Sequence, residues 1–233
     1  MLSILRPPRS FEREFLDAPD VDPEVVARSL ADVARSNALF GGRSAAIEEF
    51  RDALSELPRC ASLLDVGTGL GDIPLRAREV AYEVGIELHS FGLDSSEQLA
   101  RASSTAVDSV VCGDALELPF ADRSVDVVMC SQVLHHFSPP DALTLLREMD
   151  RVARVRVIVS DLRRSRVAAV GLWLASFPLG FHAVSRHDGV VSVMRGFTPD
   201  ELVDTVREAV ARPATVHRRR AFRVTTSWAP RHR

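Results

Sequence analysis

The stretch from Leu63 to Asp72, which reads LLDVGTGLGD, constrains the fold more than any other part of the chain. A short apolar run ends there at three glycines spaced by two, which is the pattern of a buried strand running into a tight turn. The following residues have the apolar spacing of a helix, with Asp72 suited to cap it and Pro74 suited to its first turn. Glycines at such a junction let a ligand lie against bare backbone. The loop residues predicted to contact that ligand are Gly67, Thr68, Gly69 and Gly71.

The glycine spacing distinguishes two kinds of ligand. A dinucleotide fingerprint has glycines at the first, third and sixth positions, but the sixth position here is Asp72, whose charge would repel a pyrophosphate. The form GxGxG, preceded by Asp65 on the strand, resembles motif I of the class I S-adenosylmethionine-dependent methyltransferases. That cofactor carries a cationic sulfonium, an α-amino group and no phosphate, so nearby carboxylates such as Asp65 favour it. A glycine loop alone can also be a structural turn, so the rest of the chain has to support the interpretation.

Two more acidic residues follow predicted strands. Asp94 ends the run over residues 86–93, about twenty residues beyond the glycines, and Asp114 follows the run over residues 107–112. The carboxyl ends of neighbouring strands face the ligand crevice in a doubly wound sheet. We therefore expect Asp94 to accept hydrogen bonds from ribose hydroxyls and Asp114 to accept one from the adenine amine. Asp94 could instead cap the helix that Ser95 opens. The predicted cofactor site also includes the residues that directly follow these acids, Ser95 and Ala115.

The passage CGDALELPFADRSVDVVMCSQVLHHF, residues 112–137, resembles the ubiquinone/menaquinone-type methyltransferases. With the glycine loop, the resemblance covers roughly residues 63–161 and implies S-adenosylmethionine as cofactor. It also implies that Asp114 lies at the adenine and that the fourth strand, which ends at Ser131, stops beside the methionine moiety. A nucleic-acid methyltransferase of the amino-group type is disfavoured, because its proline motif would come too late here, at residues 138–141, and would lack the aromatic residue.

We predict an α/β protein with the Rossmann-like class I methyltransferase fold, built on a seven-stranded, mostly parallel sheet. Residues 1–58 are predicted to form an N-terminal helical cap, and residues 59–233 the S-adenosylmethionine-binding domain. Residues 163–197 have the length of an insertion after the fifth strand that covers the substrate. The aromatic stripe within this insertion is interpreted as core, with the wall of an apolar acceptor pocket as the alternative; it consists of Trp173, Phe177 and Phe181.

The composition of the chain disfavours several classes of binding partner. The net charge of −3 comes from interspersed acids and bases, which does not favour a polyanion such as nucleic acid. The three cysteines are predicted to be buried free thiols of a reducing compartment, with no metal site; they are Cys60, Cys112 and Cys130.

Residues 1–10 lack the apolar length of a signal peptide, and the apolar run over residues 168–181 is shorter than the ~20 residues of a membrane span. We therefore expect a cytoplasmic protein with a small-molecule acceptor and no stable membrane insertion, and the sequence is compatible with a homodimer.

The predicted activity is methyl transfer from S-adenosylmethionine to a small, largely apolar acceptor. We favour O-methylation of a phenolic or polyketide-like hydroxyl, as in secondary metabolism, and keep C-methylation of a quinone-type precursor as the alternative. Two alternatives come from other classes. A nicotinamide-dependent oxidoreductase is disfavoured by Asp72 and the Asp114 loop, and a non-catalytic cofactor-binding protein is disfavoured by the intact glycines and by Asp94.

O-methylation of a phenol calls for a proton acceptor, because a phenol of pKa near 10 is a poor nucleophile while it is protonated. Histidine is the natural candidate. We rank His187 first as the catalytic base, because it lies in the insertion next to Asp188. We rank His136 second, because it follows the fourth strand and the family pattern places this position near the acceptor.

Overall fold

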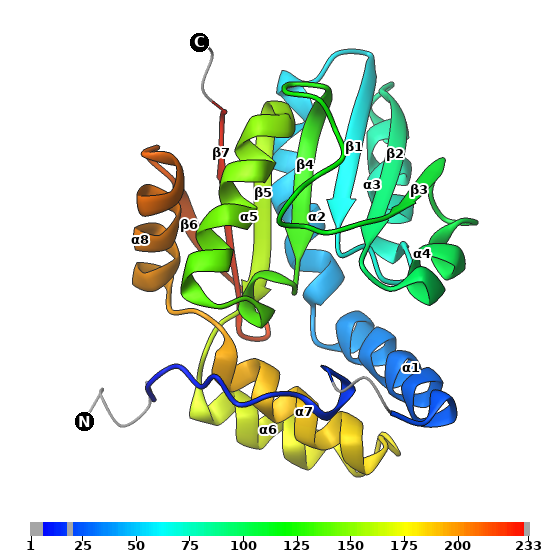
Figure 1. Cartoon of the computed structure of the whole chain (residues 1–233), viewed down its shortest axis with the longest axis vertical. Coiled ribbons are helices and arrows are strands. Elements are labelled where there is room, and N and C mark those ends of the chain that lie inside the picture. The colour runs from blue at the N-terminus through cyan, green and yellow to red at the C-terminus, as the bar shows by residue number, and fades with distance from the viewer. Residues whose placement is uncertain (1–6, 18–20, 231–233) are drawn as a thin grey trace.

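A seven-stranded sheet runs through the molecule in the order β3-β2-β1-β4-β5-β7-β6 (Figure 1). The computed structural model describes residues 7–17 and 21–230. The strands are β1 (Cys60–Val66), β2 (Glu87–Asp94), β3 (Ser109–Cys112), β4 (Val125–Ser131), β5 (Ala153–Leu162), β6 (Thr215–Arg219) and β7 (Arg223–Trp228). The first five are parallel, and β7 is antiparallel to both β5 and β6. This arrangement confirms the predicted fold class.

Helices cover both faces of the sheet, which is why its central strands are apolar almost throughout. On one face, α5 (Pro139–Val152) and α8 (Pro199–Val210) pack their apolar sides against the sheet. On the other face, α2 (Gly42–Ala53) and α3 (Asp72–Glu83) do the same, and a short 3-10 turn, η3 (Leu54–Glu56), follows α2. The helix α4 (Glu97–Ser103) connects β2 to β3 at the edge of the sheet. β4 is buried along its whole length between these layers.

Local sequence signals account for most helix starts. Thr198 and Glu201 form a capping box at the start of α8, in which each side chain accepts a hydrogen bond from the other residue's backbone. Two predicted starts are wrong by one residue. Asp72 is the first residue of α3 and not its cap, because Gly71 takes the cap position with a φ of +75° that favours glycine. Ser96, and not Ser95, caps α4 by accepting a hydrogen bond from the backbone of Leu99.

A second layer of helices lies beyond the carboxyl edge of the parallel strands (Figure 1). It contains α1 (Pro23–Leu39), α6 (Arg166–Ser176) and α7 (Ala183–Arg195), together with residues 7–17, which end in the 3-10 turn η2 (Phe15–Asp17). We call this group, residues 7–17, 21–39 and 163–197, the cap layer. The predicted insertion after the fifth strand is thus a helical hairpin. Of the predicted N-terminal cap over residues 1–58, positions 1–6 and 18–20 lie outside the described part of the chain, and α2 packs against the sheet instead of joining the cap layer.

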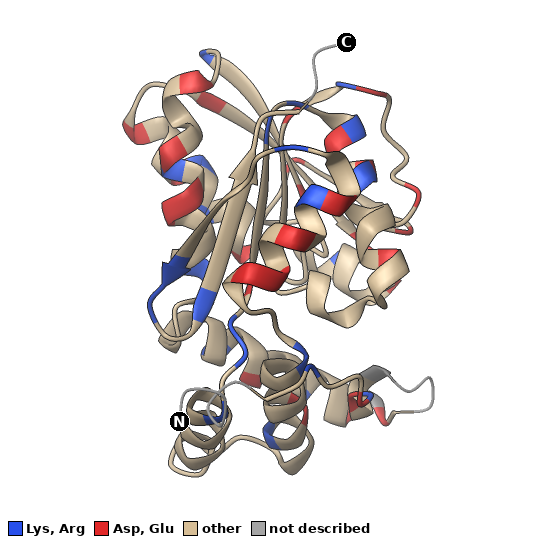
Figure 2. Cartoon of the chain, turned by 90° about the vertical axis from the view of Figure 1, so that its left-hand side faces the viewer, with Lys and Arg blue, Asp and Glu red and all other residues tan. Residues whose placement is uncertain are grey.

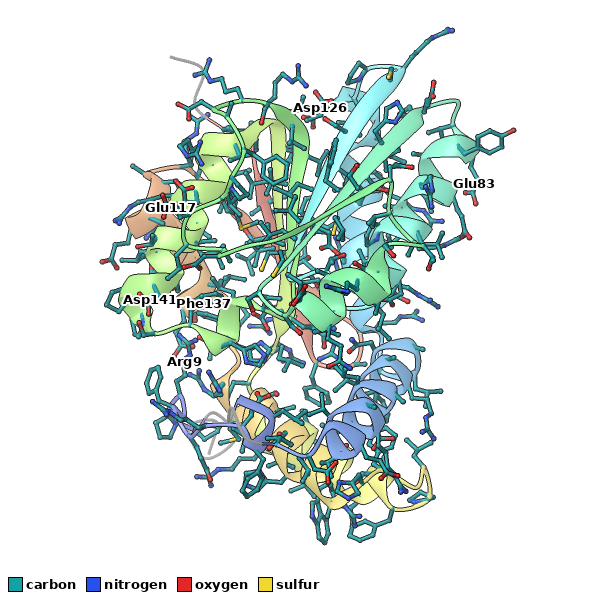
Figure 3. All side chains as sticks on the ribbon, turned by 45° about the vertical axis from the view of Figure 1, so that its right-hand side comes forward. Arg9, Glu83, Glu117, Asp126, Phe137 and Asp141 are labelled. Atoms are coloured by element: carbon teal, nitrogen blue, oxygen red, sulfur yellow. The ribbon has the colours of Figure 1, made fainter. Side chains whose placement is uncertain are left out.

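Residues 7–17, the N-terminal segment, lie along α7 and are held there by hydrogen bonds to its backbone and to one of its side chains. The backbone of Ser10 donates to the carbonyl of Met194 at 3.0 Å. The carboxylate of Asp188 accepts from the backbone of Phe15 and Leu16 at 2.9 and 3.0 Å. Arg9 lines a hollow at the start of α5, and Figure 3 shows it beneath Phe137 and Asp141. The segment therefore lies along α7, with Arg9 beside the start of α5.

Two expectations about buried residues are wrong. Trp173 and Phe177 are 46% and 50% exposed, because α6 buries its opposite side, at Ala169, against Leu162 and Val193; of the stripe, only Phe181 is buried. Cys60 and Cys112 are exposed at strand ends, where burial is least complete, while Cys130 is buried; all three are free.

No helix in the described ranges combines the length and the apolar character that crossing a membrane requires.

Candidate active site

The carboxyl ends of β1, β2, β3 and β4 bring the predicted cofactor-binding residues to one edge of the sheet. Register pairs Val66 with Leu93 and Asp94 with Cys112, so the glycine loop, Asp94 and the Asp114 loop follow one another across the edge. Val66 also pairs with Cys130, which places Ser131 beside the start of the glycine loop on the other side. The structure thus groups residues that the sequence separates by more than sixty positions.

The glycine loop has a conformation that side chains rarely adopt. Gly67, Gly69 and Gly71 have φ values of +73°, +55° and +75°, in the left-handed region that favours glycine. A Cβ on Gly67 would lie 2.3 Å from Cγ2 of Val133, so alanine would fit there only if Val133 moved. A Cβ on Gly69 would meet no atom within 4 Å, so bare backbone faces open space at this position. The middle of the loop is therefore the part that a ligand can approach most closely.

Asp94 ties the second strand to this loop. Its Oδ2 accepts a hydrogen bond from the backbone of Gly69 at 3.0 Å, and its Oδ1 accepts one from the backbone of Ser96 at 3.0 Å. The side chain is largely buried, at 8% exposure. Each carboxylate oxygen can accept a second hydrogen bond, so Asp94 has acceptor capacity left for a pair of ligand hydroxyls.

Asp65 and Ser131 present buried acceptor atoms to the same edge. Asp65 Oδ1 and Ser131 Oγ have no hydrogen-bond partner within the described ranges. Burial and, to a lesser extent, the negative charges of Asp72 and Asp94 together raise the pKa of Asp65 to about 7. A buried carboxylate with an unpaired oxygen and with other acids nearby is stabilised by a cationic group. The site therefore fits the ammonium and sulfonium of S-adenosylmethionine better than a phosphate.

The loop that contains Asp114 follows the carboxyl end of β3. Oδ1 of Asp114 accepts a hydrogen bond from the backbone of Leu116 at 2.8 Å, and the backbone of Gly113 donates to the carbonyl of Asp94 at 3.0 Å. Asp114 is exposed, as is Ser95, while Ala115 is partly buried. The loop thus sits next to Asp94 with a carboxylate that a ligand can reach from solvent.

A buried histidine and aspartate lie at the neighbouring strand ends, β4 and β5. His135 Nδ1 is 2.6 Å from Asp161 Oδ1, and the backbone of His135 donates to Asp161 Oδ2 at 3.0 Å. Burial by itself raises the pKa of Asp161, but the interactions with His135, with the backbone of Leu162 and with His136 together outweigh it, and the pKa lies below its usual range. An ionised Asp161 holds the proton of His135 on Nδ1, which leaves the lone pair on Nε2. That Nε2 atom is buried and has no hydrogen-bond partner among the residues described.

Three groups surround His135 from the cap layer and the turn after β4. The ring of His136, in the 3-10 turn η4 (Leu134–His136), lies 4.2 Å from the ring of His135, and about a third of its side chain is exposed. Burial lowers the pKa of His136 to about 3, helped by the neighbouring His135 and by the positive charge of Arg195. Arg195 of α7 donates to the carbonyls of His135 and His136 at 3.1 and 2.6 Å. Glu14 of the N-terminal segment lies close to both rings. One of its carboxylate oxygens, a ring nitrogen of His135 and a ring nitrogen of His136 all lie within 4.8 Å of one another.

His187, the first-ranked base, has different surroundings. It lies on α7, with Nδ1 2.9 Å from Asp188, Nε2 3.7 Å from Glu12, and its ring packed on Phe15. These contacts hold it between α7 and the N-terminal segment. The predicted bases His136 and His187 are therefore in separate environments, and only His136 adjoins the end of β4.

Sequence reasoning missed the pair of His135 and Asp161. The two residues are 26 positions apart and meet only because β4 and β5 are neighbours in the sheet. A usable signal was present, since Asp161 ends an apolar strand as Asp94 does, and His135 follows the adjacent strand by four residues.

Together, the sheet order, the glycine loop and the acids at the strand ends define a class I S-adenosylmethionine-dependent methyltransferase, and a family model described as "Methyltransferase domain" matches residues 64–159. The chain is 30% identical to the demethylmenaquinone methyltransferase of Roseiflexus castenholzii over 220 residues, which are 83% of this chain and 88% of that protein. The chain belongs to the quinone-type family of these methyltransferases.

A second relative agrees with this assignment, and a solved structure shares the fold. The demethylmenaquinone methyltransferase of a Roseiflexus species, strain RS-1, is 35% identical over 118 residues, which are 49% of this chain and 47% of that protein, so this match spans less than half of the relative. The magnesium protoporphyrin IX methyltransferase of Synechocystis PCC 6803 with bound S-adenosylmethionine has the same fold, with a TM-score of 0.55 and 12% identity over 92% of this chain and 100% of that one.

Proposed function

We propose that the enzyme transfers a methyl group from S-adenosylmethionine to the hydroxyl of a small, largely apolar phenolic or polyketide-like acceptor. Asp65 and Ser131 would hold the methionine end of the cofactor, Asp94 the ribose hydroxyls and Asp114 the adenine amine. The bound cofactor supplies an electrophilic methyl group. The protein contributes alignment of the acceptor for in-line displacement and a site that excludes water.

The observation that carries the proposal is the buried pair of His135 and Asp161. A phenol gains nucleophilicity when a neighbouring group takes its proton, and Nε2 of His135 is an acceptor atom without a partner in the described structure. The ionised carboxylate of Asp161 stabilises the imidazolium that this proton transfer creates. Because Glu14 lies close to both histidine rings, the acceptor hydroxyl would take the position of the Glu14 carboxylate.

This geometry supports His135 ahead of both histidines favoured from the sequence. A pKa of about 3 makes His136 a weak base at neutral pH, although its exposed ring can contact an acceptor. His187 is occupied by Asp188 and Glu12. We therefore assign proton acceptance to His135 and contact with the acceptor ring to His136.

The names of the relatives favour a second candidate, C-methylation of a quinone-type precursor. The same base serves both reactions, since removing the phenolic proton also raises the nucleophilicity of the adjacent ring carbon. The two differ in which acceptor atom faces the methyl group. Exposed free thiols at Cys60 and Cys112 suit a reducing compartment, which supports a cytoplasmic setting for either reaction.

The test is product analysis with methyl-labelled S-adenosylmethionine. The full chain would be incubated with a 2-alkyl-1,4-naphthohydroquinone and, separately, with a hydroxylated aromatic polyketide, and the products would be separated by mass and examined by NMR. We expect a labelled methyl on oxygen, formed at a rate that falls in His135→Gln. A labelled methyl on ring carbon would replace O-methylation with the second candidate.

A further inference from the structure

Exposed apolar side chains gather on the cap layer. In the described structure the large exposed apolar residues of that layer are Phe11, Phe15, Val33, Leu39, Val167, Val170, Trp173, Leu174 and Phe177. The sheet and its covering helices carry fewer, namely Leu70, Leu75, Tyr82 and Val84. Figure 2 shows the same contrast, because the lower helices are mostly tan while the helices beside the sheet carry red and blue bands. An apolar surface of this kind marks an interaction site.

The exposed residues of α6 share one side of the helix. Successive residues of a helix are rotated by 100° about its axis. On this basis the large exposed apolar residues between Val167 and Phe177 lie within an arc of about 120° around the helix. Their exposure ranges from 46% at Trp173 to 57% at Val170 and Leu174. The opposite side, at Ala169, packs on α7 and the sheet. α6 therefore has two apolar sides, and only one is used inside the molecule.

The charged side chains of residues 162–187, which include α6 and its connection to α7, are all positive. Residues 162–187 contain no aspartate or glutamate. Arg166 is exposed at the start of α6 and falls within the same arc. Arg186 lies with its guanidinium 3.9 Å above the ring of Phe177, which in turn packs edge-on against Trp173 at 4.9 Å. Basic and aromatic groups are thus interleaved on one surface.

We infer that this face of α6 docks the enzyme on the surface of an anionic lipid bilayer. Trp and Phe side chains with arginines beside them are typical of helices that lie in the membrane interface, with apolar groups among the acyl chains and arginines at the headgroups. A second copy of the chain fits less well. A symmetric dimer would place the same patch against itself and bring its arginines together, whereas anionic headgroups neutralise them. This docking is peripheral and independent of which acceptor the enzyme methylates.

The experiment measures binding of the full chain to vesicles of neutral phosphatidylcholine and to vesicles that also contain phosphatidylglycerol. Cosedimentation should show binding to the anionic vesicles and several-fold weaker binding to the neutral ones. Trp173 emission should shift to shorter wavelength on binding, while Trp228, which is 2% exposed, contributes a constant background. Leu174→Asp should lower the partition coefficient by about tenfold or more, because it places a charge in the apolar face. Arg166→Ala should lower it by about fivefold on anionic vesicles only.

Val84→Asp is the matched control, since Val84 is 59% exposed on the sheet side of the molecule. It should bind vesicles as the wild type does. Thermal melting and S-adenosylhomocysteine affinity, measured on every variant, separate loss of docking from loss of fold. Absence of vesicle binding, equal binding to neutral vesicles, or equal losses in Leu174→Asp and Val84→Asp would overturn the inference. So would a concentration-dependent dimer in light scattering that Leu174→Asp dissociates, because the face would then belong to a second copy.

Discussion

The pKa of Asp65 predicts how cofactor binding should depend on pH. Without a ligand the buried carboxyl has a pKa of about 7, so it holds a proton below that pH. The ammonium group of the cofactor needs the ionised form, and binding must therefore release the proton. Affinity should fall about tenfold for each pH unit below 7, which amounts to about thirtyfold between pH 8 and pH 5.5.

The assay is calorimetric titration with S-adenosylhomocysteine, which keeps the ammonium group, at both pH values. Repeating it in buffers of different ionisation enthalpy counts the proton released at pH 5.5. Asp65→Asn should bind weakly at both pH values and release no proton, while Asp114→Asn should keep the slope of the wild type. Without cofactor, Asp65→Asn should also melt at a higher temperature than the wild type at pH 8. The pKa of Asp65 is raised on folding, so the stability of the wild-type protein falls as the pH rises from the pKa of this carboxyl in the unfolded chain to about 7. A wild-type affinity independent of pH would refute the assignment of Asp65 to the ammonium group.

The remaining predictions concern the loop, the ribose acid and the base. Asp94→Ala should weaken S-adenosylhomocysteine binding ten- to a hundredfold, since charge-assisted hydrogen bonds contribute about 1.5 to 3 kcal/mol; unchanged affinity in the folded variant would remove Asp94 from the site. Gly67→Ala should be destabilised by about 1 to 2 kcal/mol from its positive φ and by about 1 to 3 kcal/mol from the clash with Val133, and calorimetric melting would contradict this if Tm were unchanged. His135→Gln should lower kcat by about 10² to 10⁴ at neutral pH, whereas His187→Gln should lower it less than tenfold, and the reverse order would return the base to His187.

Much of the fold follows from local pattern. Parallel strands buried on both faces are short apolar runs between turn residues, so the carboxyl ends of β1, β2 and β4 are predicted from sequence to within a residue. The glycine loop is readable because its positive φ angles admit few other residues. The proposed roles of Asp94 and Asp114 follow from a single rule, that the carboxyl ends of neighbouring parallel strands meet at one edge.

The rest depends on contacts between distant parts of the chain. The pairing of His135 with Asp161 depends on the order of β4 and β5 in the sheet, which periodicity does not contain. The stripe of Trp173 and Phe177 has the spacing of a buried face, but spacing cannot say which side of a doubly apolar helix meets the protein. Glu14 reaches the two histidines only because the N-terminal segment lies along α7.

Every role proposed above requires that the edge formed by the glycine loop and Asp94 holds S-adenosylmethionine. Native mass spectrometry of the purified full chain titrated with S-adenosylmethionine tests it directly. We predict a complex of one cofactor per chain for the wild type, a strongly reduced complex for Asp94→Ala, and an undiminished complex for Val84→Asp. No complex with the wild type, or a complex that Asp94→Ala leaves unchanged, would contradict the account.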